Sequence, residues 1–527
     1  MEGVSGAEIV SQEDGSRSLD VLITAEEAYP AFERLILSAT SEISAGFRIF
    51  DFKTRLRSEE GRAIGEDWFD LILHALRRGV SFRLVLSDFD PVVGAKLHGL
   101  TWRSMRYAAA LKEAAGPDAR VDVSAALHPA KLAWPARLAL WPRVQSMLKD
   151  RVKSLAEMPE RKRERYLQEH PSLARMLHDR GDVPRPIRFV LPSLSPVTHH
   201  QKVAVIDRRV VYCGGLDLNE RRYDTKHHEQ PAEETWHDVQ VILRNEAAAV
   251  AAHRHLEDFV AVTQRDRSPA KASGGVLRTL SMKAEGGFRL FAPRRLLTEL
   301  ETEILRGISE ARRLIYIETQ FLRDLRVARA LATAARKRPE LELFLVLPGA
   351  PEDVAFLDSD RSDARFGEFQ QARAIRTVRR AFRQRAFVGA PARRVAYESE
   401  GRDSLHGAPL IYVHAKVCLF DDRAGIVSSA NLNGRSLRWD TEFGTPLQAS
   451  DGIADLRRRF LEHWAGPGDD GSDGALDAET CVAAWRGRAA RNVRLAPEAR
   501  AGFLLPYQME PAKRFGRDLP GIPEEMV

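Results

Sequence analysis

Two short segments of the chain carry the same arrangement of histidine, lysine and aspartate. The first is HQKVAVID, which begins at His200, and the second is HAKVCLFD, which begins at His414. In each segment a lysine follows two residues after the histidine, and an aspartate follows five residues after that lysine. A histidine can act as a nucleophile or as a general acid and base near neutral pH. A neighbouring lysine can offset the charge of an anion, so the pattern indicates chemistry on an anionic substrate.

The two segments are copies of one longer pattern. Aligned on His200 and His414, they continue without a gap as far as Arg221 and Arg435. The matched pairs are Lys202 with Lys416, Asp207 with Asp421, Gly215 with Ser429, Asp217 with Asn431, Leu218 with Leu432, and Asn219 with Asn433. An internal duplication of this kind indicates two structurally equivalent halves.

The spacing also predicts where the repeated side chains lie. A histidine and a lysine two residues apart on a strand share one face of the sheet. A turn and a second strand then return the later residues of the pattern to that face. Two docked copies would place two histidines and two lysines around one pocket of anion size. A phosphodiester suits such a pocket, because the lysines offset its charge and the amide and hydroxyl groups donate to its oxygens.

The elements that must position these residues alternate between helix and strand, which predicts an α/β fold of mixed sheets flanked by helices. In the first part of the chain, helices are expected at 25–39, 63–78 and 245–261, and strands at 81–91, 187–192, 202–207, 210–215 and 239–244. In the second part, FRLFAP, RLIYIETQ, LELFLVLP, PLIYVHAKVCLFDD and GIVSSANLN are expected to form strands, and 295–310, 326–337 and 362–386 helices.

The same pattern predicts the domain organisation. The expected units are a flexible N-terminus at 1–19, a first half at 20–262, a linker at 263–280, a second half at 281–465 and a C-terminal extension at 466–527. A basic, tryptophan-bearing helical insertion is expected at about 130–183 in the first half. Such helices can lie on a lipid surface, although packing of their apolar stripe on the domain is the commoner arrangement.

Composition sets wide limits on function. The 527 residues are 44% hydrophobic and 29% charged, with a formal net charge of +6, which suits an anionic partner without requiring one. The three cysteines, Cys213, Cys418 and Cys481, exclude a dense disulfide framework and show no zinc-like spacing, so buried thiols are expected. The polar first residues do not resemble a secretory signal, and no apolar run approaches the about 18 residues of a membrane span.

The two H-x-K-x4-D motifs resemble the signature of the phospholipase D superfamily. Three further stretches narrow the resemblance to phospholipases D of the eukaryotic type: GGLDLNERRYDT followed by ETWHDVQV, YIETQFL, and SSANLNGRS. The resemblance extends from about residue 20 to residue 465, without an added C2, PX or PH-like domain, so the chain resembles a compact bacterial catalytic core of this type. Ser428 and Thr319 depart from it, since the family usually has glycine and asparagine there.

The resemblance implies a mechanism with a phosphohistidine intermediate. His200 is assigned as the nucleophile and His414 as the general acid and base, although the repeat also permits the reverse. The candidate catalytic residues are His200, Lys202, Asp207, His414, Lys416 and Asp421. The candidate supporting residues are Asp217, Asn431, Ser429, Glu442 and Asp238. No metal and no cofactor are expected to take part.

The carboxylates are expected to divide their roles. Glu442 lies 28 residues after His414, matches the glutamate that closes the second motif of the superfamily, and is expected to orient the histidine of the opposite half. The equivalent first-half position is His228, which is not a carboxylate, so Asp238 is favoured as the partner there over Asp224. Asp207 and Asp421 of the triads are expected to hold strand ends and backbone amides.

Several neighbouring residues allow more than one interpretation. Trp236 is expected in the core or the pocket wall, Glu318 and Gln320 line the pocket or satisfy a strand edge, and Arg221 and Arg435 bind phosphate or form ion pairs. His199, His227 and His228 are interpreted as loop residues. The basic run 377–394 is interpreted as a solvated helix face rather than a binding surface.

The resemblance implies a phospholipase D that hydrolyses phosphatidylcholine or a similar phospholipid to phosphatidic acid, with transfer to alcohols as a side reaction. The alternatives are a cardiolipin-synthase-like phosphatidyl transferase, a nuclease of the same superfamily, and a non-catalytic lipid-binding protein. A phospholipid at a membrane surface is the expected partner, nucleic acid is not expected, and the protein is expected to be a monomer. The expected location is soluble, either cytoplasmic or exported without a signal peptide, with peripheral membrane contact.

Overall fold

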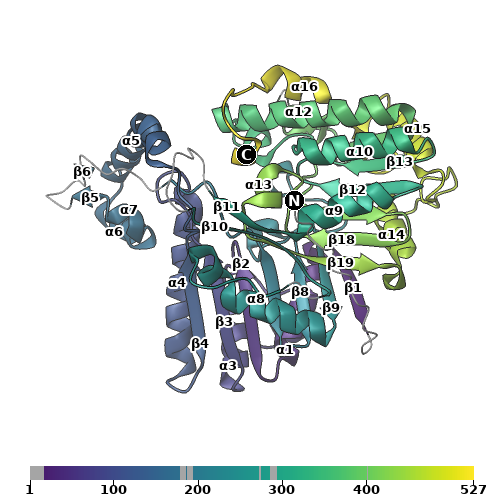
Figure 1. The fold of residues 1–527 in the computed structure, drawn as a ribbon. Coiled ribbons are helices and arrows are strands. Elements are labelled where there is room, and N and C mark those ends of the chain that lie inside the picture. Colours follow the sequence, from purple (N-terminus) through teal and green to yellow (C-terminus); the bar gives the residue numbers. More distant parts are fainter. Residues whose placement is uncertain (1–16, 179–184, 187–193, 272–273, 285–292, 400) are drawn as a thin grey trace, which may run out of the picture.

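The computed structural model describes residues 17–178, 185–186, 194–271, 274–284, 293–399 and 401–527 (Figure 1). The strand expected at 187–192 lies outside these residues, and the strand expected at FRLFAP lies almost entirely outside them. No helix within the described ranges is long and apolar enough to cross a membrane. Cys213, Cys418 and Cys481 are all free and buried, as expected.

The first half is built on a sheet of seven strands. Its order is β1-β9-β8-β7-β2-β3-β4, with β2, β3 and β4 parallel to one another and the other neighbours antiparallel. The strands are β1 Ser18–Ile23, β2 Glu42–Phe47, β3 Ser81–Ser87, β4 Val121–Ala126, β7 Lys202–Ile206, β8 Val210–Gly214 and β9 Val239–Arg244. The middle strand β7 is buried throughout, because both faces of the sheet are covered.

The second half is built on a sheet of nine strands. Its order is β11-β10-β19-β18-β17-β12-β13-β14-β20. The strands are β10 Leu277–Met282, β11 Arg294–Thr298, β12 Leu314–Thr319, β13 Glu342–Val346, β14 Ala386–Pro391, β17 Lys416–Phe420, β18 Ala424–Ser428, β19 Glu442–Gln448 and β20 Leu504–Pro506.

The two sheets repeat one topology. Read from β1, the first sheet corresponds strand for strand to the run from β10 to β14 in the second, and the two motif strands β7 and β17 occupy the same place. The strands β2, β3 and β4 are parallel to one another, as are β12, β13 and β14. In the second sheet, β17 pairs antiparallel with β12 and β18, and β18 pairs antiparallel with β19. The expected fold of two pseudo-symmetric α/β halves is confirmed.

The cores follow the alternation of side chains along the motif strands. On β7, Val203 and Val205 pack into a central core shared by the two halves, whereas Ala204 and Ile206 face an outer core. On β17, Val417 likewise faces the central core. Helices cover the outer face of each sheet and also pack between the sheets. Outside the first sheet lie α1 Thr24–Ser38, α3 Trp68–Arg77 and α4 Ala95–Ala115, and outside the second lie α9 Glu299–Glu310, α10 Leu325–Lys337 and α12 Ser362–Phe382. The central core includes α8 Glu246–Gln264 and α14 Ile453–Ala465.

Some expected boundaries differ from the structure. The helix expected at 63–78 begins at Trp68, because Asp67 caps it and accepts hydrogen bonds from the first-turn amides. The helix expected at 295–310 begins only at Glu299, since 294–298 forms β11 against β10. The linker expected at 263–280 overlaps the end of α8 and the start of β10.

The C-terminal extension expected at 466–527 is built into the second half. β20 pairs with β14 and so completes the second sheet, while α16 (Met509–Phe515) lies across α12 (Figure 1). Before β20 and α16 in the chain, α15 (Cys481–Asn492) places Val482 and Trp485 in the central core.

The helical insertion projects beside α4 and β4 (Figure 1). It consists of α5 Trp134–Ala156, α6 Glu160–Glu169 and α7 Pro171–Ala174, followed by the short pair β5 Leu177–His178 and β6 Arg185–Pro186. A small apolar core of its own includes Leu132, Val144 and Leu148. The first turns of α5 lie outside that core, and Trp134 remains 68% exposed.

Candidate active site

The two motif histidines lie where the halves meet, and the backbone there is paired across the halves. The His200 amide donates to the carbonyl of Thr441, and the His414 amide donates to the carbonyl of His237, each at 2.8 Å. Thr441 and His237 are the residues immediately before β19 and before Asp238, so the two contacts are equivalent under the internal repeat. Each motif histidine is therefore held by the opposite half.

The same crossing brings each imidazole to a carboxylate. Nδ1 of His200 lies 3.1 Å from Oε2 of Glu442, and Nδ1 of His414 lies 2.6 Å from Oδ2 of Asp238. All four side chains are buried, with His200 the most exposed at 9%. A carboxylate at Nδ1 leaves Nε2 of each ring as the atom that can attack or exchange a proton. The contact expected between Glu442 and the opposite histidine is present.

Asp238 is the true counterpart of Glu442, although the sequence spacing hides it. Glu442 lies 28 residues after His414, whereas Asp238 lies 38 residues after His200. The first repeat is therefore longer by ten residues between the second strand of the motif and its carboxylate. Asp238, which was favoured over Asp224 as the first-half partner, is therefore the carboxylate that contacts a motif histidine. Asp224, the other candidate, contacts His228 and not a motif histidine.

Positive charge surrounds the two rings. Each motif lysine folds back on its own histidine: the Lys202 ammonium donates to the His200 carbonyl at 2.6 Å, and Lys416 donates to the His414 carbonyl. Both ammonium groups are buried. Burial lowers the pKa of His200 and His414, and the positive charge of the lysines lowers it further. Such a pocket favours a bound anion.

Burial dominates the titration of the site. It raises the pKa of Glu442 to about 8 and of Asp238 to about 6, and it lowers the pKa of Lys416 to about 7. The pKa of Lys202 is lowered for the same reason. An anion in the pocket would raise the pKa of both lysines again, because its negative charge stabilises their protonated form.

These shifts predict a pH-dependent affinity for sulfate, whose charge is constant near neutrality. The dianion binds more tightly when Lys416 is protonated. The affinity for sulfate is therefore highest below pH 7, and it falls by up to about tenfold per pH unit as the pH rises above the Lys416 pKa of about 7. Calorimetry between pH 6 and 9 measures this slope. Lys416→Gln should bind weakly at every pH, and a wild-type affinity that stays constant over this range would contradict the prediction.

Asp207 and Asp421 do not face the pocket. They lie at the far ends of the motif strands, where both adopt positive φ angles of 51° and 53°. Asp207 accepts hydrogen bonds from the amides of Thr40, Ser41 and Glu42, and Asp421 accepts from the equivalent amides at 312–314. The prediction that both aspartates are catalytic is therefore wrong. The alternative expectation, that they hold strand ends and backbone amides, agrees with the structure.

Replacing Asp207 with asparagine should cost about 2 kcal/mol of stability, because charge-assisted hydrogen bonds to three amides are weakened. Asparagine tolerates the positive φ, so the backbone can stay in place. The amide contacts hold the pKa of Asp207 below its usual range, so the stabilisation is present at neutral pH and is lost as the solution becomes strongly acidic. Urea unfolding at pH 7 and in acid measures both effects; an equal loss at both pH values would contradict this origin.

The remaining candidate supporting residues, Asp217, Asn431 and Ser429, differ in what their side chains contact. Asp217 lies in the site, 4.0 Å from the Lys202 ammonium, and accepts the Ile49 amide at 3.0 Å. Asn431 is buried, and its side-chain oxygen has no partner among the described residues. The hydroxyl of Ser429 donates to Glu442, so the structure uses it to fix that carboxylate rather than to contact a substrate.

Two arginines near the pocket were missed from the sequence. Arg48, just after β2, lies 3.9 Å from Asp217 and contributes to the lowered pKa of His200. Arg222 packs 3.5 Å from the ring centre of Trp236, which in turn lies 4.6 Å from the His414 ring. Neither arginine belongs to a repeated motif position, so only the pairing of β2 with β7 and the fold of the loop before Asp238 reveal them.

An apolar hollow of about 430 Å³ reaches Thr198, two residues before His200. Its walls come from the helical insertion, the loop before His200 and the C-terminus, and include Phe89, Leu132, Val144, Met147, Leu194 and Met526. Its polar end contains Thr198 and Arg435, and Arg435 lies near enough to lower the pKa of His200. Arg435 also pairs with Asp440 at 3.1 Å, so the expected ion pair is present. An anionic group and an apolar chain could be held side by side here.

Comparisons with known proteins agree with this geometry. Residues 304–464 match the family described as "Cardiolipin synthase, PLD-like domain". Residues 304–464 therefore form a phospholipase D-like domain. This domain contains the second motif, with its histidine, its lysine and Glu442, and the first half repeats its topology. The resemblance inferred from the two motifs is confirmed.

Two curated relatives match a little under half of the chain at low identity. Phospholipase D A of Dictyostelium discoideum is 24% identical over 331 residues, covering 47% of this chain and 24% of the relative. Phospholipase D1 of Saccharomyces cerevisiae is 25% identical over 328 residues, covering 45% of this chain and 19% of the relative. The chain thus spans about a quarter or less of these relatives. The solved phosphatidylserine synthase of Haemophilus influenzae Rd KW20 is 12% identical with a TM-score of 0.46, covering 84% of this chain and 85% of that structure.

Proposed function

We propose that this protein is a phospholipase D that removes the headgroup of a phospholipid such as phosphatidylcholine. The observation that carries the proposal is the crossed pair of histidines, His200 with Glu442 and His414 with Asp238. An apolar hollow that reaches Thr198 and Arg435 supports it. The ring nitrogens suit cleavage of a phosphodiester, and the hollow suits the apolar part of a lipid.

The geometry supports a two-step displacement. Nε2 of His200 attacks phosphorus, forming a P–N bond as the bond to the headgroup oxygen breaks. Protonated Nε2 of His414 gives its proton to that oxygen, so the headgroup leaves as an alcohol and not as an alkoxide. His414 then removes a proton from water, whose oxygen attacks phosphorus, breaks the P–N bond and releases phosphatidic acid. Lys202 and Lys416 offset the phosphate charge throughout.

A second candidate is phosphatidyl transfer to the alcohol of another lipid. The family matched by residues 304–464 is described as a cardiolipin synthase, which favours this reaction. The two candidates differ only in the acceptor of the second step, because an alcohol can replace water in the attack on the P–N bond.

One assay separates the candidates. Purified protein is incubated with phosphatidylcholine vesicles, with and without 1-butanol, and in parallel with phosphatidylglycerol and with single-stranded DNA. Phosphatidic acid, together with phosphatidylbutanol when butanol is present, is the result expected for phospholipase D. Cardiolipin formed from phosphatidylglycerol without phosphatidic acid would favour the transferase. Cleavage of DNA but not of lipid would overturn the lipid substrate and leave the superfamily chemistry intact.

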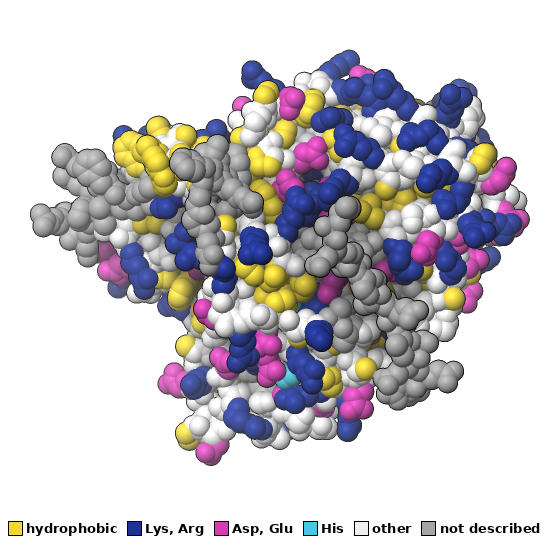
Figure 2. Space-filling model, in the orientation of Figure 1, with side chains coloured by type: hydrophobic (Ala, Val, Ile, Leu, Met, Phe, Trp, Pro, Cys, Tyr) yellow, Lys and Arg dark blue, Asp and Glu magenta, His cyan; other side chains and the backbone are white. Residues whose placement is uncertain are grey.

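The proposed lipid substrate also assigns a role to the start of α5. Trp134, Leu138 and Leu140 are 68%, 55% and 40% exposed, and hydrophobic side chains gather over α5 in Figure 2. The same helix lines the apolar hollow through Val144 and Met147. We propose that this face of α5 contacts the membrane and brings the hollow to the lipid.

The double variant Trp134→Ser, Leu138→Ser should bind phosphatidylcholine vesicles at least about tenfold more weakly, because two large side chains no longer enter the lipid surface. Vesicle sedimentation measures this, and turnover of a monomeric short-chain phospholipid should change by less than about twofold. Leu495→Ser, at a residue 42% exposed in the second half, is the matched control. Equal binding by all three proteins would contradict the proposed contact.

A further inference from the structure

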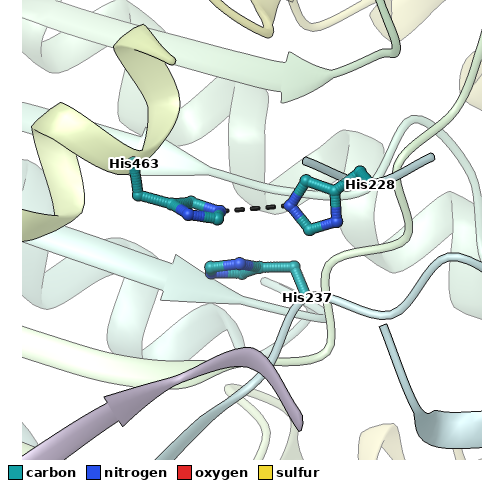
Figure 3. A group of neighbouring side chains, drawn as sticks. All are labelled: His228, His237 and His463. Carbon is teal, nitrogen blue, oxygen red and sulfur yellow. Dashed lines mark hydrogen bonds between the residues drawn. The ribbon is translucent and has the colours of Figure 1, made fainter. Parts of the chain in front are cut away.

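Three histidines outside the active site converge at the boundary of the two halves. His228 comes from the loop after β8, His237 immediately precedes Asp238, and His463 projects from α14 of the second half (Figure 3). One ring nitrogen of each lies within 4.8 Å of the others. His228 and His237 are fully buried, and His463 is half-buried.

The ring nitrogens divide into those with carboxylate partners and those that face one another. Nδ1 of His228 lies 2.7 Å from Asp224, and Nε2 of His237 lies 2.7 Å from Glu318. Nε2 of His228 and Nε2 of His463 face each other at 3.1 Å. Nδ1 of His237 is buried without a hydrogen-bond partner among the described residues. An unpaired buried imidazole nitrogen is costly, and a ligand would relieve that cost.

Glu318 is itself fixed by further hydrogen bonds. It accepts the hydroxyl of Tyr316 at 2.5 Å and the indole N–H of Trp464 at 2.6 Å, in addition to His237. Asp224 likewise accepts the backbone amide of Trp236 at 2.7 Å. Carboxylates held in this way behind histidine rings are typical of metal sites, because they fix the tautomer and raise the basicity of the ligand nitrogen. Glu318 therefore serves the histidine cluster and not the phosphate pocket.

We propose that His228, His237 and His463 bind one Zn²⁺ ion. Imidazole nitrogen suits Zn²⁺, and Zn–N bonds of about 2.0–2.1 Å place neighbouring ligands of a tetrahedron roughly 3.3 Å apart. The 3.1 Å separation of His228 and His463 is close to this value. His463 is half-buried, so water can supply the fourth ligand.

The proposed ion has a structural role that can be read from its position. His228 lies in the stretch by which the first repeat is longer than the second, and His463 belongs to the other half. His237 carries the carbonyl that accepts the His414 amide, and its chain neighbour Asp238 contacts the His414 ring. The ion would tie the longer loop to α14 and so hold Asp238 in register. It takes no part in the phosphate chemistry, so this inference does not depend on the proposed lipid substrate.

Metal analysis of the purified full-length chain tests the proposal. We expect about one Zn²⁺ per chain, and after chelation we expect Co²⁺ to give the intense visible absorption of a tetrahedral site. His463→Gln is the decisive variant, because its half-buried side chain can be changed without opening the core, and it should weaken Zn²⁺ binding at least about 100-fold. Glu318→Gln should weaken it by about 10- to 100-fold.

His227→Gln is the matched control, since His227 is an exposed neighbour of the cluster. It should retain the wild-type Zn²⁺ content and affinity. Chelation should lower the Tm of the wild type and of His227→Gln, and should leave the Tm of His463→Gln unchanged. Wild-type protein that contains no Zn²⁺ and binds none in competition with a chromophoric chelator would overturn the proposal. A His463→Gln variant that binds Zn²⁺ as tightly as the wild type would also overturn it.

Discussion

Replacing either His200 or His414 with alanine should lower turnover of a phospholipid by at least about 10,000-fold, because each variant removes a whole step of the reaction. Without His200 the proposed nucleophile is absent. Without His414 no acid is placed to protonate the departing headgroup. Phosphatidic acid release from phosphatidylcholine vesicles measures the loss, and His227→Gln is the control for the removal of an imidazole outside the site.

A substrate with an activated leaving group separates the two roles. A p-nitrophenyl phosphodiester expels a stable anion, so its first step needs no acid. If His200 is the nucleophile, His414→Ala should still react with this ester and accumulate a phosphohistidine, visible as a mass increase in the intact protein. His200→Ala should remain inactive. Accumulation of the adduct in His200→Ala instead would reverse the assignment, and loss of both activities without any adduct would contradict the covalent mechanism.

The two-half fold was predictable because the motif repeat encodes it. The match between the segments at His200 and His414 implied equivalent strands, and the buried runs KVAVI and KVCLF could belong only to the middle of a covered sheet. The crossed pairing with Glu442 could also be predicted from the sequence. The 28 residues after His414 lead through β17 and β18 to the start of β19, where Glu442 lies.

The remainder of the site depends on differences between the repeats, which the alignment could not place. The longer loop before Asp238 moved the first-half carboxylate out of register, so His228 took its position in the ungapped comparison. The same loop carries two residues of the histidine cluster, and the third, His463, is more than two hundred residues away. No local spacing marks such a cluster, because its members meet only when α14 packs against the first half. Arg48 was hidden for the same reason, since strand pairing alone brings it to His200.

Replacing the crossed carboxylates should have the next largest effect. Glu442→Gln and Asp238→Asn should each lower phospholipid turnover by about 100- to 10,000-fold, because a neutral amide does not stabilise the protonated histidine and its NH2 group can bind Nδ1 of the wrong tautomer. The loss should appear in kcat rather than in KM, since neither carboxylate is placed to contact the substrate. Asp207→Asn is the matched control: it removes a carboxylate of the same repeat, and it should lower stability while changing kcat of the folded protein by only a few-fold.

The crossing itself can be tested in the background of His414→Ala with the p-nitrophenyl ester. In that background only the attack by His200 remains, and His200 is oriented by Glu442. Glu442→Gln should therefore still slow adduct formation by about 100-fold or more, whereas Asp238→Asn should have almost no further effect, because its partner ring is absent. If Asp238→Asn were as damaging there as in the wild type, Asp238 would be acting on His200 or on the fold. If Glu442→Gln had no effect there, each carboxylate would serve the histidine of its own half, and the crossed arrangement of the two halves would not be the one that performs the reaction.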